Sequence, residues 1–332
     1  MLRPGREVPL LALAPMQEVT DWPFWNLMRR YGGPDVYVTE YFRVSPGSHL
    51  SRYILRSVTE NPTGRPVIAQ FIGNSIPDLT RLSRLLQDEY PVAGIDLNLG
   101  CPAPVVYKKC AGGGLLREPH RVDAILGSMR QAITDIPFTV KTRIGFDDPA
   151  VFEALLPIFA KHQIDLLSVH GRTVAEGYRS EVHYDYIARA AEVLPCPVLA
   201  NGGISTVTDA VAVMQQTLAH GLMLGRGAIR NPWLFDQIRQ QYRGESVFAP
   251  TGRDVQNYIQ ALYDEITDPA APEKGRVTRM KKYLIYIAVG VSPEFLHDIR
   301  RAQDHDTFFT ICREHLDHNR PVALAPEGMD VK

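Results

Sequence analysis

The stretch GIDLNLGCP, residues 94–102, decides the fold because a strand within it ends abruptly beside a thiol. Apolar residues alternate with Asp96 and Asn98, which is typical of a β-strand, and Gly100 then breaks the pattern. In a parallel barrel, catalytic residues gather where the strands end. Cys101 directly follows the break and is the candidate catalytic residue. A buried structural cysteine next to a turn is the alternative interpretation.

Short apolar runs of this kind alternate with longer amphipathic runs from residue 10 to residue 227. Eight of the short runs are predicted to be strands: Leu10–Met16, Asp35–Glu40, Pro66–Gly73, Gly94–Gly100, Phe138–Gly145, Leu166–Arg172, Cys196–Gly203 and Gly221–Gly227. Helices are predicted between them, among others over 78–88, 121–134, 151–162 and 206–217.

This alternation predicts an α/β protein with a parallel sheet. Eight strand–helix units in this length match a closed (β/α)8 barrel, or TIM barrel. An open, doubly wound sheet is the alternative. We disfavour it because no G-x-G-x-x-G motif opens the first helix, and the first strand ends instead in Ala14-Pro15-Met16.

The pattern changes after Tyr242, where strand-like runs stop. Residues 243–251 are rich in turn formers, and residues 268–273 contain two prolines. Helices are predicted near 254–267, 276–289, 293–301 and 306–315. We therefore expect a catalytic barrel domain over residues 1–242, followed by a small helical bundle over residues 243–332.

The overall charge excludes a general electrostatic attraction to nucleic acid. The chain has 332 residues, with 36 basic and 37 acidic side chains and a net charge of -1. Residues 274–301, however, contain seven basic residues and only two acidic ones. This segment is either a local binding patch or an ordinary solvated helix face.

The four cysteines are scattered and show no metal-ligand spacing, so we expect neither a disulfide scaffold nor a metal site. They favour a reducing, cytoplasmic setting. The apolar stretch near the N-terminus is too short for a secretory signal, and no run approaches the roughly 18 apolar residues of a membrane span. The sequence therefore predicts a protein that is neither exported nor embedded in a membrane.

Glycines at two strand ends predict a phosphate site. The seventh strand ends in Asn201-Gly202-Gly203, and the eighth ends in Gly225-Arg226-Gly227. In barrels, the loops after these two strands often bind phosphate through backbone N–H groups and a helix N-terminus. A phosphorylated cofactor is therefore expected at this point.

Cationic and amide side chains end three other strands. Lys141 and Arg143 alternate onto one side of the fifth strand, His170 ends the sixth, and Gln70 lies near the end of the third. Ionisable groups are costly inside a barrel unless they are paired or used. A flavin would use them, because its pyrimidine edge is electron-rich and its side chain ends in phosphate. Taken singly, each could equally be an ordinary polar residue at a strand end.

Together these motifs resemble the FMN-dependent tRNA-dihydrouridine synthases over nearly the whole chain. The matching segments are 14–16, 98–102, 140–143, 169–173, 201–203 and 225–227. Three more segments, 39–44, 177–181 and 277–282, are similar to the subgroup that acts at uridine 16 of the tRNA D-loop. Two residues depart from the family pattern: the second thiol Cys110, and Tyr184 where the family tends to have tryptophan.

The resemblance implies reduction of the C5–C6 double bond of a tRNA uridine by FMN, which NADPH reduces first. It implies that Cys101 donates the proton, since an ordinary thiol is mostly protonated at neutral pH, and that Asn98 reads the uracil. The residues implied to bind FMN are Pro15, Met16, Gln70, Lys141, His170, Asn201, Gly202, Gly203, Gly225 and Arg226. Those implied to bind tRNA are Arg43, Arg143, Arg279, Lys281, Lys282 and Arg300.

Several alternatives remain open from the sequence. The target could be another D-loop uridine, at position 20 or 17. The chain could also be an FMN-dependent reductase of a small pyrimidine or enone, although the basic helical segment would then have no use. A tRNA-binding protein with an inert barrel is the non-enzymatic alternative. We expect a monomer.

Overall fold

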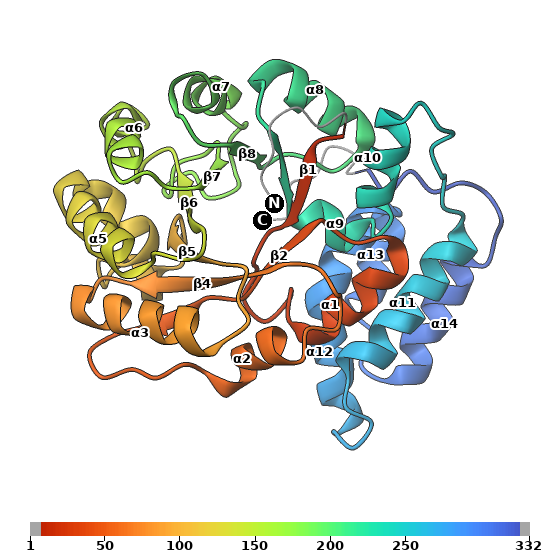
Figure 1. Ribbon diagram of the computed structural model, residues 1–332. Coiled ribbons are helices and arrows are strands. Elements are labelled where there is room, and N and C mark those ends of the chain that lie inside the picture. Colours follow the sequence, from red (N-terminus) through yellow and green to blue (C-terminus); the bar gives the residue numbers. More distant parts are fainter. Residues whose placement is uncertain (1–7, 326–332) are drawn as a thin grey trace. The chain divides into compact units, whose positions relative to one another are not determined.

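The computed structural model describes residues 8–325, and its centre is one parallel sheet that closes on itself (Figure 1). The strands are β1 (Leu10–Leu13), β2 (Val36–Val38), β3 (Phe42–Val44), β4 (Val67–Gly73), β5 (Gly94–Leu99), β6 (Phe138–Arg143), β7 (Leu166–His170), β8 (Val198–Asn201) and β9 (Gly221–Leu224). Their order is β2-β1-β9-β8-β7-β6-β5-β4-β3, and β2 also pairs with β4. The ring is therefore closed by all strands except β3, as the predicted (β/α)8 barrel requires.

The ring closes where β1 meets β9, and a glycine makes this approach possible. Leu10 pairs with Gly221 in parallel register. A Cβ atom on residue 221 would lie 2.1 Å from the Leu10 carbonyl oxygen. A side chain at position 221 would thus push these two strands apart.

The strand β3 was not predicted. It pairs with the end of β4, in register Phe42 with Phe71 and Val44 with Gly73. Phe42 and Val44 are buried whereas Arg43 between them is exposed. Three residues are too few for an alternating pattern to be recognised in a sequence, which explains the omission.

The chain forms two compact units. Of the described residues, the first unit contains 8–22, 34–203 and 211–224, and the second contains 23–33, 204–210 and 225–325. The first unit thus holds the whole strand ring. The units divide after Leu224 rather than after Tyr242, and the assignment of separate functions to residues 1–242 and 243–332 stays a prediction whose outermost residues lie outside the described range.

Helices surround the strands of the first unit (Figure 1). They are α2 (Arg52–Thr59), α3 (Ile76–Glu89), α4 (Pro104–Tyr107), η2 (Gly112–Arg117), α5 (Pro119–Ala132), α6 (Val151–Lys161), α7 (Tyr184–Val193) and α8 (Val207–Thr217), whose first turn is grouped with the second unit. Neighbouring helices α3, α5, α6 and α7 contact one another in sequence around the ring. This order is the one that successive right-handed strand–helix–strand connections produce.

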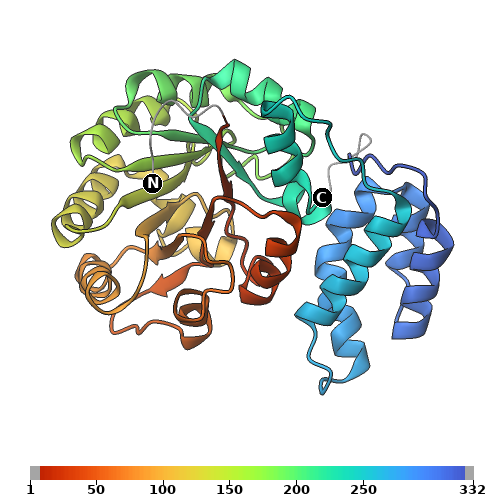
Figure 2. The same cartoon turned by 45° about the vertical axis from the view of Figure 1, so that its right-hand side comes forward.

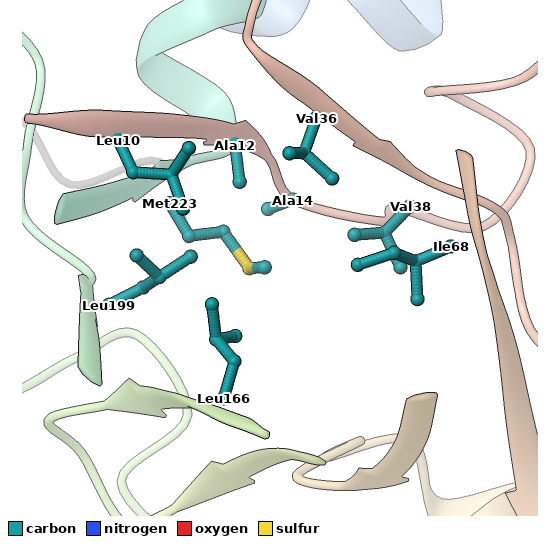
Figure 3. Close-up of a cluster of buried hydrophobic side chains, with 9 residues drawn as sticks. All are labelled: Leu10, Ala12, Ala14, Val36, Val38, Ile68, Leu166, Leu199 and Met223. Atoms are coloured by element: carbon teal, nitrogen blue, oxygen red, sulfur yellow. The ribbon is translucent and has the colours of Figure 1, made fainter. Parts of the chain in front are cut away.

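Apolar side chains fill the interior of the barrel on the side where the strands begin (Figure 3). Figure 3 shows Met223 reaching toward the middle, with Leu10, Leu166 and Leu199 around it. The polar residues that end the strands lie at the opposite end of the ring, here called the barrel mouth. The interior is therefore filled with apolar side chains where the strands begin, and polar side chains gather where the strands end. Reactive groups are accordingly expected at the mouth.

The second unit is entirely helical in the residues described. Its elements are α1 (Trp22–Met28), η1 (Arg29–Tyr31), α9 (Arg226–Arg230), α10 (Leu234–Tyr242), α11 (Gly252–Ile266), α12 (Glu273–Ile287), η3 (Ala288–Gly290), α13 (Pro293–Ile299) and α14 (His305–Leu316). Helices α11 to α14 form the expected bundle (Figure 2). A capping box between Thr251 and Asp254 fixes the start of α11. Across the described part of both units, no helix is long and apolar enough to cross a membrane.

Candidate active site

The candidate thiol lies just beyond β5, and the side chain of Asn98 holds its backbone. The Oδ1 atom of Asn98 accepts hydrogen bonds from the backbone N–H groups of Gly100, at 3.0 Å, and Cys101, at 2.9 Å. Asn98 itself is buried, whereas Cys101 is partly exposed. The structure thus fixes the Cys101 backbone at the barrel mouth, while its side chain packs against Tyr41, Ile72 and Val106 and stays partly exposed.

A chain of hydrogen bonds runs from this turn into the barrel. Asn98 Nδ2 donates to Gln70 Oε1 at 2.9 Å, and Gln70 Nε2 donates to Asp96 Oδ2 at 2.8 Å. The other oxygen of Asp96 accepts from the Thr139 hydroxyl at 2.6 Å. All four residues are buried. The structure therefore brings Gln70 and Asn98, which were predicted to serve the cofactor and the substrate respectively, into direct contact. It also places the carboxylate of Asp96, which the sequence reasoning did not single out as a site residue, against Gln70.

Lys141 lies beside this chain on β6, in register with Asn98 of β5. Burial and the neighbouring Arg143 together lower the pKa of Lys141 to about 8, while Asp96 and Cys101 oppose the shift. Burial also raises the pKa of Asp96 to about 6, although Thr139, Gln70 and Lys141 act in the opposite direction. Such shifted pKa values in one cluster are typical of functional sites.

The predicted phosphate loop after β8 contains a tight turn at two glycines. Gly202 and Gly203 have φ angles of 111° and 72°, which side-chain-bearing residues rarely adopt. The Tyr184 hydroxyl donates to the Gly202 carbonyl oxygen at 3.0 Å. This tyrosine, noted above as a departure from the family, therefore supports the turn. His170 borders the same glycines, with Nε2 3.2 Å from where a Cβ of Gly202 would stand.

The remaining residues predicted to bind cofactor follow β1, β8 and β9. Met16, after Pro15, donates its backbone N–H to the Thr20 hydroxyl at 2.7 Å, so that the loop after β1 turns back at the mouth. Asn201 donates its side-chain amide to the Met223 carbonyl oxygen at 2.7 Å. Gly225 and Arg226 belong to the second unit, where Gly225 precedes the first turn of α9. Their participation in cofactor binding stays a prediction.

The Arg143 side chain is placed differently from what a tRNA contact would require. It is only 3% exposed, and it donates to the carbonyl oxygens of Gly100, Thr173 and Gly177 at 2.8–3.0 Å. Burial lowers the pKa of Arg143. Arg143 thus ties the turn before Cys101 to the loop that follows β7, and its predicted contact with tRNA has no support in this geometry.

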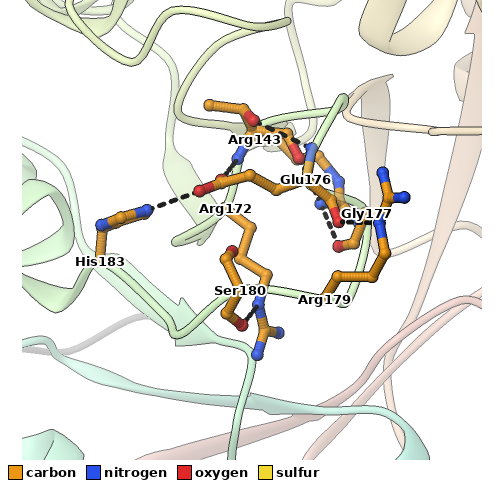
Figure 4. A network of polar contacts seen from close by, with 8 residues as sticks. Arg143, Arg172, Glu176, Gly177, Arg179, Ser180 and His183 are labelled. Atoms are coloured by element: carbon orange, nitrogen blue, oxygen red, sulfur yellow. Dashed lines mark hydrogen bonds and ion pairs between the residues drawn. The ribbon is translucent and has the colours of Figure 1, made fainter. Parts of the chain in front are cut away.

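The loop after β7, residues 171–183, is ordered by a polar network (Figure 4). Glu176 accepts hydrogen bonds from the Thr173 backbone at 2.6 Å and contacts His183 Nε2 at 2.8 Å. Burial opposes ionisation of Glu176, yet the hydrogen bonds from His183 and Thr173 prevail and lower its pKa to about 2. Arg172 donates to the Ser180 carbonyl oxygen at 2.7 Å. The sequence analysis missed this network, because hydrogen bonds within a loop leave no periodic pattern.

The loop presents Tyr178 at the barrel mouth. Its ring is 40% exposed, stands edge-on to the His170 ring at a centroid distance of 5.9 Å, and has the Arg143 guanidinium 5.3 Å from its centroid. A pocket of about 420 Å³ beside it is lined by Pro102, Tyr107, Phe146, Val174, Ala175, Gly177, Tyr178 and Arg179. An exposed aromatic ring beside such a pocket can stack on a planar ligand.

The other cations predicted to bind tRNA lie on both units. Arg43 in β3 is exposed, and its guanidinium lies 5.7 Å from the Tyr41 ring centroid. In the second unit, α12 carries Arg279, Lys281 and Lys282, and Lys281 Nζ donates to the carbonyl oxygen of Arg300 at 3.0 Å. The Lys281 side chain thus lies against the backbone of Arg300 within the helical unit. Whether these cations contact tRNA stays a prediction.

The second thiol that the sequence singled out takes a special backbone conformation. Cys110 has a φ of 52° and is partly exposed, and its carbonyl oxygen accepts from Asn74 Nδ2 at 3.1 Å. Burial raises the pKa of the other two thiols, to about 11 for Cys196 and about 12 for Cys312. Cys196 and Cys312 are therefore structural residues of the core.

Comparison with known sequences shows to which protein family the chain belongs. A family model described as "Dihydrouridine synthase (Dus)" matches residues 12–318. The chain belongs to the dihydrouridine synthase family. It is therefore a flavin-dependent oxidoreductase, as its sequence predicted. The match spans the barrel and the helical unit alike.

Individual relatives carry more specific names. The tRNA-dihydrouridine(16) synthase of Pseudomonas putida is 33% identical over 82% of this chain and 86% of its own length, and that of Neisseria meningitidis serogroup A is 31% identical over 82% and 84%. A tRNA-dihydrouridine synthase B from Pasteurella multocida is 32% identical over 85% of this chain and 84% of its own length. The expected resemblance to the uridine-16 synthases is confirmed, while relatives with another name are equally similar.

Solved structures confirm the barrel. A histamine dehydrogenase from Rhizobium sp. 4-9 superposes with a TM-score of 0.53 at 14% identity, over 78% of this chain and 50% of that chain. An old yellow enzyme homologue from Zymomonas mobilis gives 0.50 at 12% identity, over 72% and 90%. At this identity the likeness concerns the fold alone.

Proposed function

We propose that the chain is a tRNA-dihydrouridine synthase that reduces uridine 16 of the D-loop, with FMN as the bound flavin, NADPH as the reductant and Cys101 as the proton donor. The observation that carries the proposal is the arrangement at the mouth, where a partly exposed thiol stands beside a buried amide and a half-buried lysine. We further propose that the chain acts in the cytoplasm as a monomer.

The residues at the mouth fit a flavin mononucleotide. When bound, the flavin would supply a hydride to C6 of the uracil. The glycine turn at Gly202–Gly203 would take the phosphate through backbone N–H groups. Lys141 would face the electron-rich pyrimidine edge, and its ammonium form stabilises negative charge there.

Cys101 would complete the reduction. A hydride added at C6 must be matched by a proton at C5, and a thiol at the mouth can give that proton and later regain one from water. Asn98 would hold the uracil in place through its side-chain N–H. The target nucleotide must leave the tRNA fold to reach the mouth, which costs a few kcal/mol, and contacts to the backbone must offset that cost.

The basic surface of the helical unit would supply those backbone contacts. Lys274, Arg276, Arg279, Lys281 and Lys282 lie on one helix, and Arg300 adjoins Lys281. Neutralising phosphates releases counterions, so binding should weaken as salt increases. We propose that residues 243–332 serve this purpose and that recognition depends mainly on the shape of the tRNA.

Dihydrouridine mapping tests this function. Unmodified tRNA transcripts are incubated with the purified, flavin-loaded chain and NADPH, and the modified positions are mapped. Dihydrouridine at position 16 alone is expected. Modification at position 17 or 20 would keep the reaction and overturn the position. Absence of dihydrouridine, together with rapid oxidation of the reduced flavin by a small pyrimidine or enone, would overturn the tRNA substrate.

A further inference from the structure

The hydrogen-bond chain from Asp96 to Cys101 has two ends at which the donor and acceptor roles are fixed. At one end, an ionised carboxylate can only accept, and Asp96 accepts from Gln70 and Thr139. At the other end, the backbone N–H groups of Gly100 and Cys101 can only donate. Side-chain amides can be turned either way in principle, but here both ends demand the same orientation.

The amide orientations follow step by step from the carboxylate. Asp96 draws the Gln70 Nε2 group toward itself, so that Gln70 Oε1 points at Asn98. That oxygen requires a donor, so Asn98 turns its Nδ2 group toward Gln70 and its Oδ1 toward the turn. Reversing either amide would place two donors or two acceptors face to face, at the cost of buried unsatisfied groups.

This orientation limits what Asn98 can offer to a bound base. Both lone pairs of its Oδ1 atom are taken by Gly100 and Cys101. One N–H of Nδ2 is taken by Gln70, and within the described part of the chain no partner is seen for the other. Asn98 can therefore donate to a carbonyl oxygen of the base, whereas it has no acceptor for an N–H group.

We infer that Asp96 is a positioning residue of the active site: its carboxylate orients the Gln70 amide and, through it, the Asn98 amide, so that Asn98 both anchors the Cys101 backbone and presents a donor alone to the base. The role toward the base rests on the proposed function, whereas the role toward Cys101 does not. Neither role requires Asp96 to touch a ligand.

An exchange of the two groups tests the inference. In the Asp96→Asn/Gln70→Glu double variant, residue 96 donates to the carboxylate at residue 70, which still accepts from Asn98. The exchange conserves the total charge of the two side chains, their approximate volume, and the presence of one donor and one acceptor between residues 70 and 96. The Gln70→Glu variant alone opposes two carboxylates across the 2.8 Å contact, and only a shared proton can relieve that repulsion.

The readout is alkylation of Cys101 by iodoacetamide in the purified, flavin-loaded protein, followed by peptide mass spectrometry. Cys110, also partly exposed, serves as an internal reference. Gln70→Glu should raise the Cys101 rate relative to Cys110 by about fivefold or more, which corresponds to the loss of one hydrogen bond. The double variant should return to within about twofold of the unmodified chain.

The inference is overturned if Gln70→Glu leaves the Cys101 rate unchanged, or if the double variant is as disturbed as Gln70→Glu. No tRNA is present, so this result does not depend on the proposed function. The donor role is tested separately with transcripts carrying 2-thiouridine or 4-thiouridine at the target, because sulfur accepts hydrogen bonds weakly. At least one should lower kcat/KM by about tenfold; equal activity on both would refute the donor role while leaving the reaction in place.

Discussion

The Arg143 guanidinium lies 5.3 Å from the centroid of the Tyr178 ring, and it also donates to the carbonyl oxygen of the residue before that ring, Gly177. Both contacts belong to a side chain that is almost fully buried. A cation placed in this way stabilises the loop over the mouth and is withdrawn from solvent. Arg143 therefore positions the loop that carries Tyr178.

The Arg143→Lys variant should loosen this loop, because an ammonium cannot reproduce the directed bonds to three carbonyl oxygens. We expect hydrogen exchange over residues 171–183 to accelerate by about tenfold. The salt dependence of tRNA binding should stay unchanged. Arg189→Lys, on the exposed surface of α7, is the control. A shallower salt slope with unchanged exchange would instead make Arg143 a phosphate contact.

Replacing the candidate proton donor should separate the two halves of the reaction. Cys101→Ala should keep its flavin and its oxidation of NADPH, while reduction of tRNA by the pre-reduced enzyme slows by about 10²- to 10⁴-fold. Cys110→Ala is the matched control and should react within about twofold of the unmodified chain. Single-turnover oxidation of the reduced flavin by tRNA, followed by the flavin absorbance, measures this rate. Full activity of Cys101→Ala would remove the thiol from the chemistry.

The pKa of Lys141 predicts how flavin binding depends on pH. Burial and Arg143 lower that pKa to about 8, so the ammonium group is present below this pH and is lost as the pH rises through it. The affinity of flavin-free protein for FMN should therefore fall between about pH 7 and 9. Lys141→Arg stays charged and should remove this ionisation from the profile. Fluorescence titration measures both, and identical profiles for the two proteins would contradict the assignment.

Removing charge from α12 should weaken tRNA binding without touching the flavin. Substituting Arg279, Lys281 and Lys282 by alanine should reduce the slope of log affinity against log salt by about 2, if each cation neutralises one phosphate. Flavin content should stay constant. Lys161→Ala, which removes an exposed lysine paired with Asp123 on the barrel surface, should leave the slope unchanged. An unchanged slope in the triple variant would refute the basic surface.

The sequence predicted the barrel because strand periodicity and strand-end glycines are local signals. The eight predicted strands are all present, and their ends do gather Cys101, Lys141 and His170 at one mouth. What it could not predict are contacts between residues distant along the chain. The hydrogen bond between Gln70 and Asn98 joins residues that are 28 positions apart, and each amide taken alone suggests a ligand contact.

The contacts of Arg143 are a second example of what the sequence could not predict. Its residue type and its place on a strand end both suggest an anion contact, and only the path of the loop after β7 shows that carbonyl oxygens surround it. The division into units is also non-local, because α1 near the N-terminus is grouped with the C-terminal helices. Periodicity predicts which face of a segment is buried against the core, but not which other segment packs against that face.

The buried carboxylate of Asp96 should reduce the stability of the fold at neutral pH. Burial raises its pKa from 3.8 to about 6, so proton binding to the folded state adds stability below about pH 4, and this contribution is lost as the pH rises through 6. Asp96→Asn should therefore raise the free energy of unfolding at pH 8 by up to about 3 kcal/mol, and the gain should vanish near pH 4. Asp123→Asn is the control of opposite sign, since Lys161 and His162 lower the pKa of that carboxyl. Urea unfolding at both pH values measures the free energy of unfolding of the variant and of the unmodified chain. If the gain in stability from Asp96→Asn is no larger at pH 8 than at pH 4, the ionised carboxylate does not destabilise the fold.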